Sequence, residues 1–151
     1  HGCDAIQIFD SWASVLDSEG FDRWVIEPTS KIIQNVRKIY PDFPIIGFPK
    51  GAGVNYLKYQ SETEVSGISF DSSVPLNWIR DNIQTKTTVQ GNLDNMVLLS
   101  GGNQLDEQVN KIIKILGKGS FIFNLGHGVL PNTPIDNVER VINIVRKKFN
   151  G

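Results

Sequence analysis

The chain has 151 residues, of which 40% are hydrophobic, and a formal net charge of -1 at pH 7. This size suffices for one hydrophobic core but not for two large domains. Lys and Arg are dispersed among acidic residues, which argues against a nucleic-acid-binding protein, and no apolar run approaches the roughly 20 residues that span a bilayer. Cys3 is the only cysteine, which excludes an internal disulfide and favours a reducing cytoplasm.

Five short runs of apolar or β-branched residues, each followed by a polar or glycine-containing turn, predict five β-strands. In chain order they cover residues 5–9, 44–48, 67–70, 88–91 and 120–125. Apolar residues at helical spacing predict helices between these strands and after the last one. The clearest patterns cover 21–40, 105–116 and the stripe Val138, Val141, Ile142 and Val145, and weaker ones cover 54–61 and 75–82.

The alternation of strands and helices favours parallel βαβ units, as found in doubly wound sheets and in (β/α)8 TIM barrels. Polar residues follow every predicted strand. In a barrel the carboxyl ends of all strands surround one site, whereas a doubly wound sheet concentrates its site at one switch point. The sequence therefore favours an α/β fold of the barrel type.

A complete barrel has eight strands and typically about 250 residues. The first predicted strand follows the amino terminus almost at once, as if the chain began inside a fold. We therefore expect residues 1–151 to form a single incomplete domain, the carboxy-terminal part of a TIM barrel with about five βα units. Its open strand edges and interior would be exposed unless another chain covers them.

His127 follows the last predicted strand and stands between Gly126 and Gly128. The glycines let a ligand approach the backbone and permit a positive φ on either side of the histidine. The imidazole could act as a general acid or base, or donate a hydrogen bond to a carboxylate. The alternative is a histidine that only hydrogen-bonds the turn. Thr133 could cap the helix that begins near Pro134.

A second candidate group follows the first strand. Phe9 could form an aromatic wall, Ser11 could donate to an anionic group, and Asp10 could hold a neighbouring loop. The competing interpretation is a core phenylalanine followed by a helix-capping Ser or Asp.

Lys50 follows the second strand among glycines but lacks the spacing of a nucleotide-binding loop. We expect Lys50 to pair with a strand-end carboxylate such as Asp71 or Asp94. Asn92 lies in a segment expected mainly to brace loops through hydrogen bonds between side chains and backbone, and within it Asn92 is the more plausible ligand contact. A zinc centre is not expected, because the chain has only Cys3 and two histidines.

Four motifs together resemble the carboxy-terminal half of the uroporphyrinogen decarboxylase family. They are Phe9-Asp10-Ser11-Trp12, residues 45–51 (IIGFPKG), residues 90–94 (QGNLD) and residues 124–128 (NLGHG) followed by Pro131, Thr133 and Pro134. The resemblance runs from the first residues to the last. It implies a cytosolic, homodimeric (β/α)8-barrel enzyme that needs no cofactor and no metal. Such an enzyme decarboxylates four acetate side chains of uroporphyrinogen III to give coproporphyrinogen III, with the protonated pyrrole as electron sink.

The resemblance also implies residue roles. Phe9, Ser11 and His127 would line the substrate cleft, with Ser11 and His127 facing each other and contacting substrate carboxylates. From the residues themselves, and not from the resemblance, Asp10, Lys50, Asp71 and Asn92 are expected to support them. The family's pyrrole-binding aspartate, its carboxylate-binding arginines and its cleft tyrosine belong to the amino-terminal half, so the isolated chain is expected to be inactive.

Three positions depart from the family pattern. Ser72 stands where many relatives have tryptophan, Asn95 where proline is common, and Ser14 where glycine is frequent. These differences concern loops rather than the assignment of the family.

Two other functions stay open from the sequence. One is a related barrel methyltransferase of the zinc- and corrinoid-linked class, which requires a His-x-Cys motif and a further cysteine in the carboxy-terminal half, whereas the only cysteine here is Cys3. The other is a non-catalytic half-barrel that serves as an interaction module and self-associates through its uncovered interior.

Overall fold

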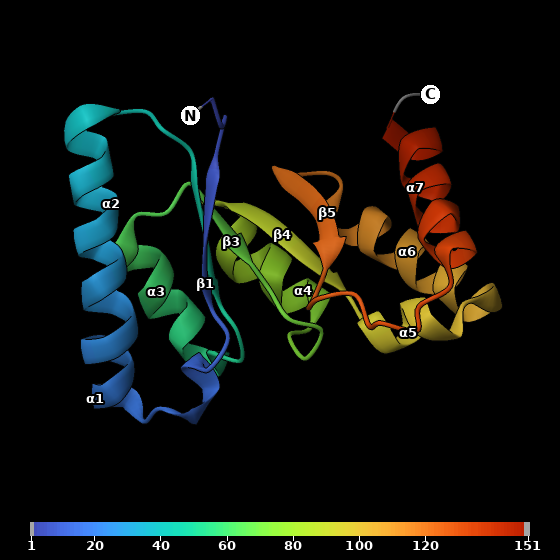
Figure 1. The fold of residues 1–151 in the computed structure, drawn as a ribbon, viewed down its shortest axis with the longest axis horizontal. Helices are drawn as coiled ribbons and strands as arrows, with labels where there is room; N and C mark the ends of the chain where they lie inside the picture. The colour runs from blue at the N-terminus through green and yellow to red at the C-terminus, as the bar shows by residue number, and fades with distance from the viewer. Residues whose placement is uncertain (1, 150–151) are drawn as a thin grey trace.

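A computed structural model describes residues 2–149, which form one parallel five-stranded sheet with helices between the strands (Figure 1). The strands are β1 (Ile6–Asp10), β2 (Ile45–Pro49), β3 (Gly67–Ser69), β4 (Thr88–Leu93) and β5 (Phe121–Leu125). All five predicted strands are confirmed, and no boundary differs from its prediction by more than two residues. They lie in the sheet in chain order, which excludes the doubly wound alternative because that fold reverses its strand order at a switch point.

The long predicted helices are confirmed as well. The first is almost continuous through α1 (Ser18–Phe21), the π-helical turn η2 (Asp22–Ile26) and α2 (Glu27–Ile39). The others are α3 (Tyr56–Thr63), α4 (Leu76–Ile79) with its π-helical extension η4 (Arg80–Gln84), α6 (Gly102–Leu116) and α7 (Ile135–Phe149). One further helix, α5 (Asn95–Ser100), was not predicted, because six residues are too few to show a helical period.

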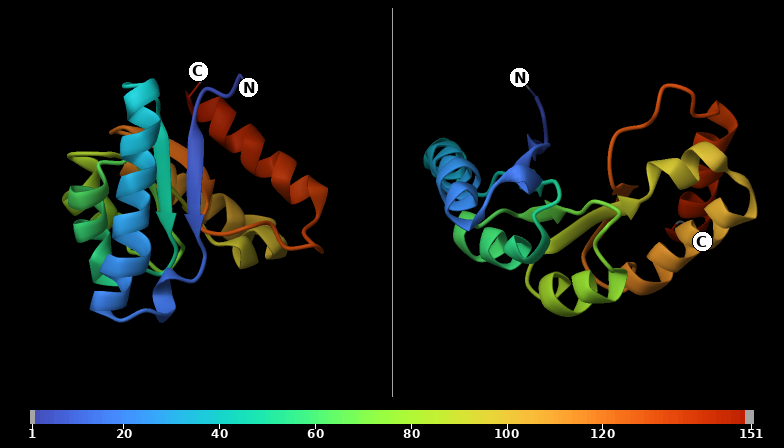
Figure 2. Two further views of the ribbon diagram at one scale, coloured as in Figure 1. Left: turned by 60° about the vertical axis from the view of Figure 1, so that its left-hand side comes forward. Right: turned by 90° about the horizontal axis from the view of Figure 1, so that it is seen from below.

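The sheet is curved, and the helices lie on its outer side (Figure 2). Alternate residues of each strand face the helices, and Ile45, Ile68 and Val89 are fully buried there. Gly47 belongs to this outer row, since a Cβ atom at this position would lie 2.3 Å from the Tyr59 hydroxyl. The hydrophobic core therefore lies between the sheet and its helices.

The inner side of the sheet carries polar side chains that meet across the curve. The Gln90 amide on β4 donates to Oε1 of Gln7 on β1 at 3.1 Å and to the Ser69 hydroxyl at 3.2 Å. Three strand spacings on a flat sheet amount to roughly 14 Å, so only a strongly curved sheet lets Gln7 and Gln90 touch. The curvature is that of a barrel wall.

Both edge strands are open in the part of the chain that the structure describes. On the inner side, Phe9 of β1 is 65% exposed and Ile122 of β5 is 40% exposed. Large apolar side chains at strand positions are usually covered, so this surface resembles part of a barrel interior. Within residues 2–149, no helix has the length and apolarity required to cross a bilayer.

Candidate functional site

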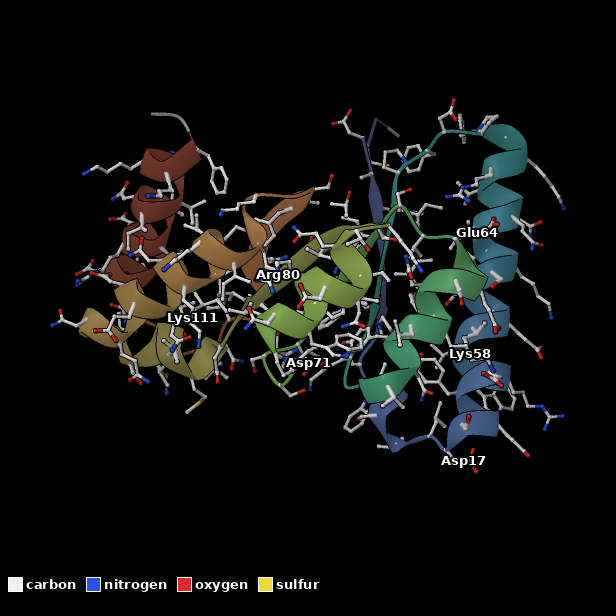
Figure 3. All side chains as sticks on the ribbon, turned by 180° about the vertical axis from the view of Figure 1, so that it is seen from behind. Asp17, Lys58, Glu64, Asp71, Arg80 and Lys111 are labelled. Atoms are coloured by element: carbon white, nitrogen blue, oxygen red, sulfur yellow. The ribbon has the colours of Figure 1, made fainter. Side chains whose placement is uncertain are left out.

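The polar residues expected at the strand ends lie along one edge of the sheet, because all five strands run in the same direction. Asp10 ends β1, Lys50 follows β2, Asp71 follows β3, Asn92 lies near the end of β4, and His127 follows β5. Figure 3 shows Asp71 in the lower half of the view, lower than Glu64 and on the side toward which Asp17 also lies. The expected clustering along the carboxyl edge is confirmed.

Asp71 is the most heavily hydrogen-bonded side chain of this edge, and it is only 7% exposed. Its Oδ2 accepts from the backbone N–H of Gly51 at 2.9 Å and from the Tyr56 hydroxyl at 3.0 Å. Its Oδ1 accepts from the backbone N–H of Ser73 at 3.0 Å and from the Ser73 hydroxyl. Burial alone would raise the pKa of this carboxyl, but these donors outweigh burial and hold the pKa below its ordinary value.

The expected ion pair between Lys50 and Asp71 or Asp94 is wrong. Among the ion pairs of residues 2–149, none involves Lys50. The oxygens of Asp71 are already used by neutral donors, and Asp94 caps α5 by accepting from the Met96 N–H at 2.8 Å. Lys50 instead acts through its backbone N–H, which donates to the Asp10 carbonyl at 3.0 Å.

The loop after β1 presents two exposed candidates. Phe9 is not a core residue; it meets Phe48 edge to face on the inner side, with ring centroids 5.9 Å apart. Ser11 is exposed, and its hydroxyl forms no hydrogen bond within the described residues. Asp10 accepts from the Trp12 N–H at 3.3 Å, so it stabilises its own turn. The competing interpretation, a core phenylalanine followed by a helix-capping Ser or Asp, is therefore wrong, because the short 3-10 helix η1 (Ala13–Val15) has Trp12 at its N-cap position and no side-chain cap hydrogen bond.

Asn92 has an architectural role. It is 6% exposed, and its amide donates to the carbonyls of Asp71 at 3.0 Å and Val74 at 2.9 Å. Both donor hydrogens of the amide therefore hold the loop after β3, as expected for a residue that braces a loop.

The loop that carries His127 is fixed through its backbone. The Gly126 N–H donates to the Leu93 carbonyl at 2.7 Å, and the Asn95 amide donates to the Gly128 carbonyl at 3.0 Å. The His127 side chain is exposed and forms no hydrogen bond within residues 2–149. A histidine that only holds the turn is therefore not what the structure shows.

The expected role of the two flanking glycines is wrong in one respect, because neither has a positive φ. Gly126 is required for packing instead. A Cβ atom there would lie 2.5 Å from the Ser72 N and 3.0 Å from the Asp71 carbonyl carbon. Nothing lies within 4 Å of the corresponding position at Gly128. Gly126 therefore lets the loop at Ser72 pack closely against the backbone, and only Gly128 leaves open space beside it.

The expected helix cap at Thr133 is also wrong. Helix α7 begins at Ile135, and the Thr133 hydroxyl is buried without a hydrogen-bond partner in the described part of the chain. Asn95, by contrast, was noted only as a departure in a loop, yet its amide holds the His127 loop. The sequence around Asn95 gives no signal for this contact, because its acceptor is a backbone carbonyl far along the chain.

The exposed candidates lie on the two edge strands. Phe9 and Ser11 belong to β1 and its loop, and His127 follows β5 at the opposite edge of the sheet. The curvature turns these edges toward each other (Figure 2). Within residues 2–149, no group of three or more His, Cys, Asp or Glu residues could hold a metal ion, and Cys3 is free and exposed.

Comparison with known proteins places the chain in a family. The family model for uroporphyrinogen decarboxylase (URO-D) matches residues 1–148. A uroporphyrinogen decarboxylase from Rhodospirillum rubrum is 50% identical over 145 residues, which are 96% of this chain and 42% of that protein. One from Brucella anthropi is 49% identical over 145 residues with the same coverage. The chain thus spans less than half the length of these curated relatives.

A solved structure supports the fold. A methyltransferase from Methanosarcina mazei matches with a TM-score of 0.74, covering 99% of this chain and 43% of that one. At 22% identity this likeness shows the fold alone. Together with the curved parallel sheet, it confirms the expected part of a (β/α) barrel. On the match across residues 1–148, the chain belongs to the uroporphyrinogen decarboxylase family.

Proposed function

We propose that the protein containing this chain is a uroporphyrinogen decarboxylase, a carboxy-lyase that removes the carboxyl groups of four acetate side chains of uroporphyrinogen III to give coproporphyrinogen III. The observation that carries this proposal is the family match over residues 1–148, together with 50% identity to a curated relative of that name. The reaction needs no cofactor in this proposal, because the protonated pyrrole ring of the substrate accepts the electrons of the breaking bond.

Three exposed residues are the proposed substrate contacts. Ser11 and His127 have polar side chains without hydrogen-bond partners in the described residues, and both lie at the carboxyl edge where barrel sites form. A hydroxyl and an imidazole N–H can each donate to a substrate carboxylate, and such charge-assisted bonds are the stronger ones. Phe9 offers an aromatic surface on the inner side of the sheet.

The supporting residues hold these contacts in place. Asp10 stabilises the turn that presents Ser11, and the Lys50 backbone connects the ends of β1 and β2. Asp71 and Asn92 fix the loop against which Gly126 packs. None of these four residues is proposed to touch the substrate.

The complete site requires more of the barrel. The five strands leave the edges of β1 and β5 open, and the curated relatives are more than twice as long as this chain. We therefore propose that residues 1–151 form one incomplete barrel domain and that the remaining strands come from the rest of the same protein. The complete protein is proposed to be a cytoplasmic homodimer.

The activity is tested on the full-length protein with uroporphyrinogen III, the products being oxidised and separated by chromatography. Coproporphyrin should accumulate, and the 151-residue chain alone should give none. An isolated chain that decarboxylated the substrate unaided would refute the proposal that its site is incomplete.

The role of His127 is tested by two substitutions in the full-length protein. His127→Ala removes the donor and should raise KM about tenfold, the usual size of a lost hydrogen bond to a charged group. His127→Gln keeps an N–H donor at a similar position and should lose less. If His127→Ala abolished kcat and left KM unchanged, His127 would serve the chemical step rather than binding.

The methyltransferase function that stays open from the sequence gains no support from the matching solved structure of that name, because this likeness shows the fold alone. Its 22% identity is far below the 50% identity to the decarboxylase from R. rubrum, so the decarboxylase is preferred. One zinc ion per chain after metal-free dialysis and reloading would favour the methyltransferase.

A non-catalytic half-barrel is the third candidate. It would leave the full-length protein without decarboxylase activity and would bind other chains through the inner face of the sheet. A sharp monomer boundary in sedimentation, without binding of an apolar dye, would argue against such a module.

A further inference from the structure

The loops at the carboxyl edge are connected through one buried carboxylate. Asp71, after β3, accepts from the Gly51 N–H of the loop after β2 and from Ser73 of its own loop. The Tyr56 hydroxyl at the start of α3 donates to the same oxygen as Gly51, at 3.0 Å. Two loops and one helix thus share a single side chain.

The loop after β2 contacts the segment that carries Ser11. Gly51 has a φ of +72°, and a Cβ atom there would lie 2.6 Å from the Cβ of Ser14. The loop after β1 therefore packs directly on the backbone of Gly51. The neighbouring Lys50 N–H adds a hydrogen bond to the Asp10 carbonyl at 3.0 Å.

The loop after β3 contacts the segment that carries His127. The Cβ position of Gly126 is 2.5 Å from the Ser72 N, so the two backbones are in close contact. Asp71 thus lies between the supports of Ser11 and His127, although neither residue touches it.

Tyr56 is the innermost member of this arrangement. It is fully buried, and its ring lies 4.6 Å from the ring of Phe70, the residue that precedes Asp71. Burial first, and then the charge of Asp71, raise the pKa of the Tyr56 phenol, so the hydroxyl remains a donor. Through its hydrogen bond, the Tyr56 phenol holds the Asp71 carboxylate in place against the core.

We propose that Tyr56 and Asp71 are positioning residues that set the placement of Ser11 relative to His127 across the site. This inference rests on the proposed function, which makes Ser11 and His127 substrate contacts, and adds to it the buried pair that holds them. The alternative is a buried tyrosine that merely satisfies its hydroxyl and contributes only to stability.

Tyr59 provides a matched control on the same helix. It is 1% exposed and packs on Gly47 and Phe21, in the core below the sheet. Tyr56→Phe and Tyr59→Phe each remove one buried hydroxyl, but only the Tyr56 hydroxyl is hydrogen-bonded to Asp71. In the full-length enzyme both should lower the Tm modestly. Only Tyr56→Phe should raise KM, by about fivefold with little change in kcat, because lost alignment of binding groups weakens binding.

A second measurement does not depend on activity. The imidazole resonances of His127, assigned by comparison with His127→Gln, should shift in Tyr56→Phe and stay in place in Tyr59→Phe. If both variants leave KM and these resonances unchanged, or if both change them equally, the positioning role is overturned. If the wild-type protein does not decarboxylate uroporphyrinogen, the proposed function fails while the resonances still test the positioning role.

Discussion

The two glycines beside His127 should respond in opposite ways to the same substitution. Neither has a positive φ, so alanine is conformationally acceptable at both positions. Gly→Ala then stabilises a protein by about 0.4–1 kcal/mol, because the unfolded chain loses freedom. Gly128→Ala should show this gain, since nothing lies within 4 Å of its Cβ position.

Gly126→Ala should lose stability despite the same gain. Its Cβ would lie 2.5 Å from the Ser72 N and 3.0 Å from the Asp71 carbonyl carbon. These are backbone atoms, and the hydrogen bonds of Asp71 hold them, so they cannot rotate away as a side-chain end would. Overpacking of this kind costs about 1–3 kcal/mol, which exceeds the gain of about 0.4–1 kcal/mol and leaves a net loss of up to about 2.6 kcal/mol.

The measurement is urea unfolding of the full-length protein and its two variants, with the slope of the transition checked for constancy. Substrate KM supplies a second readout, because displacement of the loop from Ser72 would move His127 in Gly126→Ala only. Equal stability changes in the two variants would refute the packing argument. So would a stabilised Gly126→Ala.

Three further predictions concern residues away from His127. Hydrogen-bond donors hold the pKa of Asp71 below the value near 3.9 of an unfolded aspartate, so its ionised form should stabilise the fold above about pH 4 and lose this effect as the pH drops through the folded-state pKa. Urea unfolding at a series of pH values should show that Asp71→Asn loses less stability at acid pH than the wild type, and parallel curves would contradict this. Gly47→Ala should cost about 1–3 kcal/mol because its Cβ would meet the Tyr59 ring, and a double-mutant cycle with Tyr59→Leu should show strong coupling rather than additivity. Thr133→Val should be neutral or stabilising, because the buried hydroxyl has no partner among residues 2–149, whereas loss of a true N-cap would cost about 0.5–2 kcal/mol in thermal unfolding.

The strands and long helices could be predicted because their signal is local and periodic. In α6 the predicted stripe, including Val109, Ile112 and Leu116, is the buried face. Strand ends were harder to predict, since β4 continues through Asn92 to Leu93 and the polar Asn92 lies inside the strand. A polar side chain within a strand looks like the end of that strand when only the alternation of residues is considered.

Contacts made by the backbone could not be predicted from residue types. Lys50 and Asp71 have opposite charges, which suggested an ion pair between their side chains. Asp71 instead accepts a hydrogen bond from the backbone N–H of Gly51, the residue that follows Lys50. A backbone donor has no sequence signature. For the same reason Gly126 suggested room for a ligand, whereas the space is filled by the backbone at Ser72.

The charges at the carboxyl edge bear on how the proposed substrate would bind. Asp10, Asp71 and Asp94 all lie there, and each accepts from at least one backbone N–H, which offsets part of its charge. All five arginines lie in helices, and the three with hydrogen-bond partners bind acidic residues or a carbonyl elsewhere. The proposed substrate, with eight carboxylates, would therefore meet hydrogen-bond donors such as Ser11 and His127 and the cation of Lys50 at this edge, but none of the chain's arginines. We infer that in the proposed complete enzyme residues outside this chain supply most of the cations, and that residues 2–149 contribute the shape of the site and mainly neutral donors.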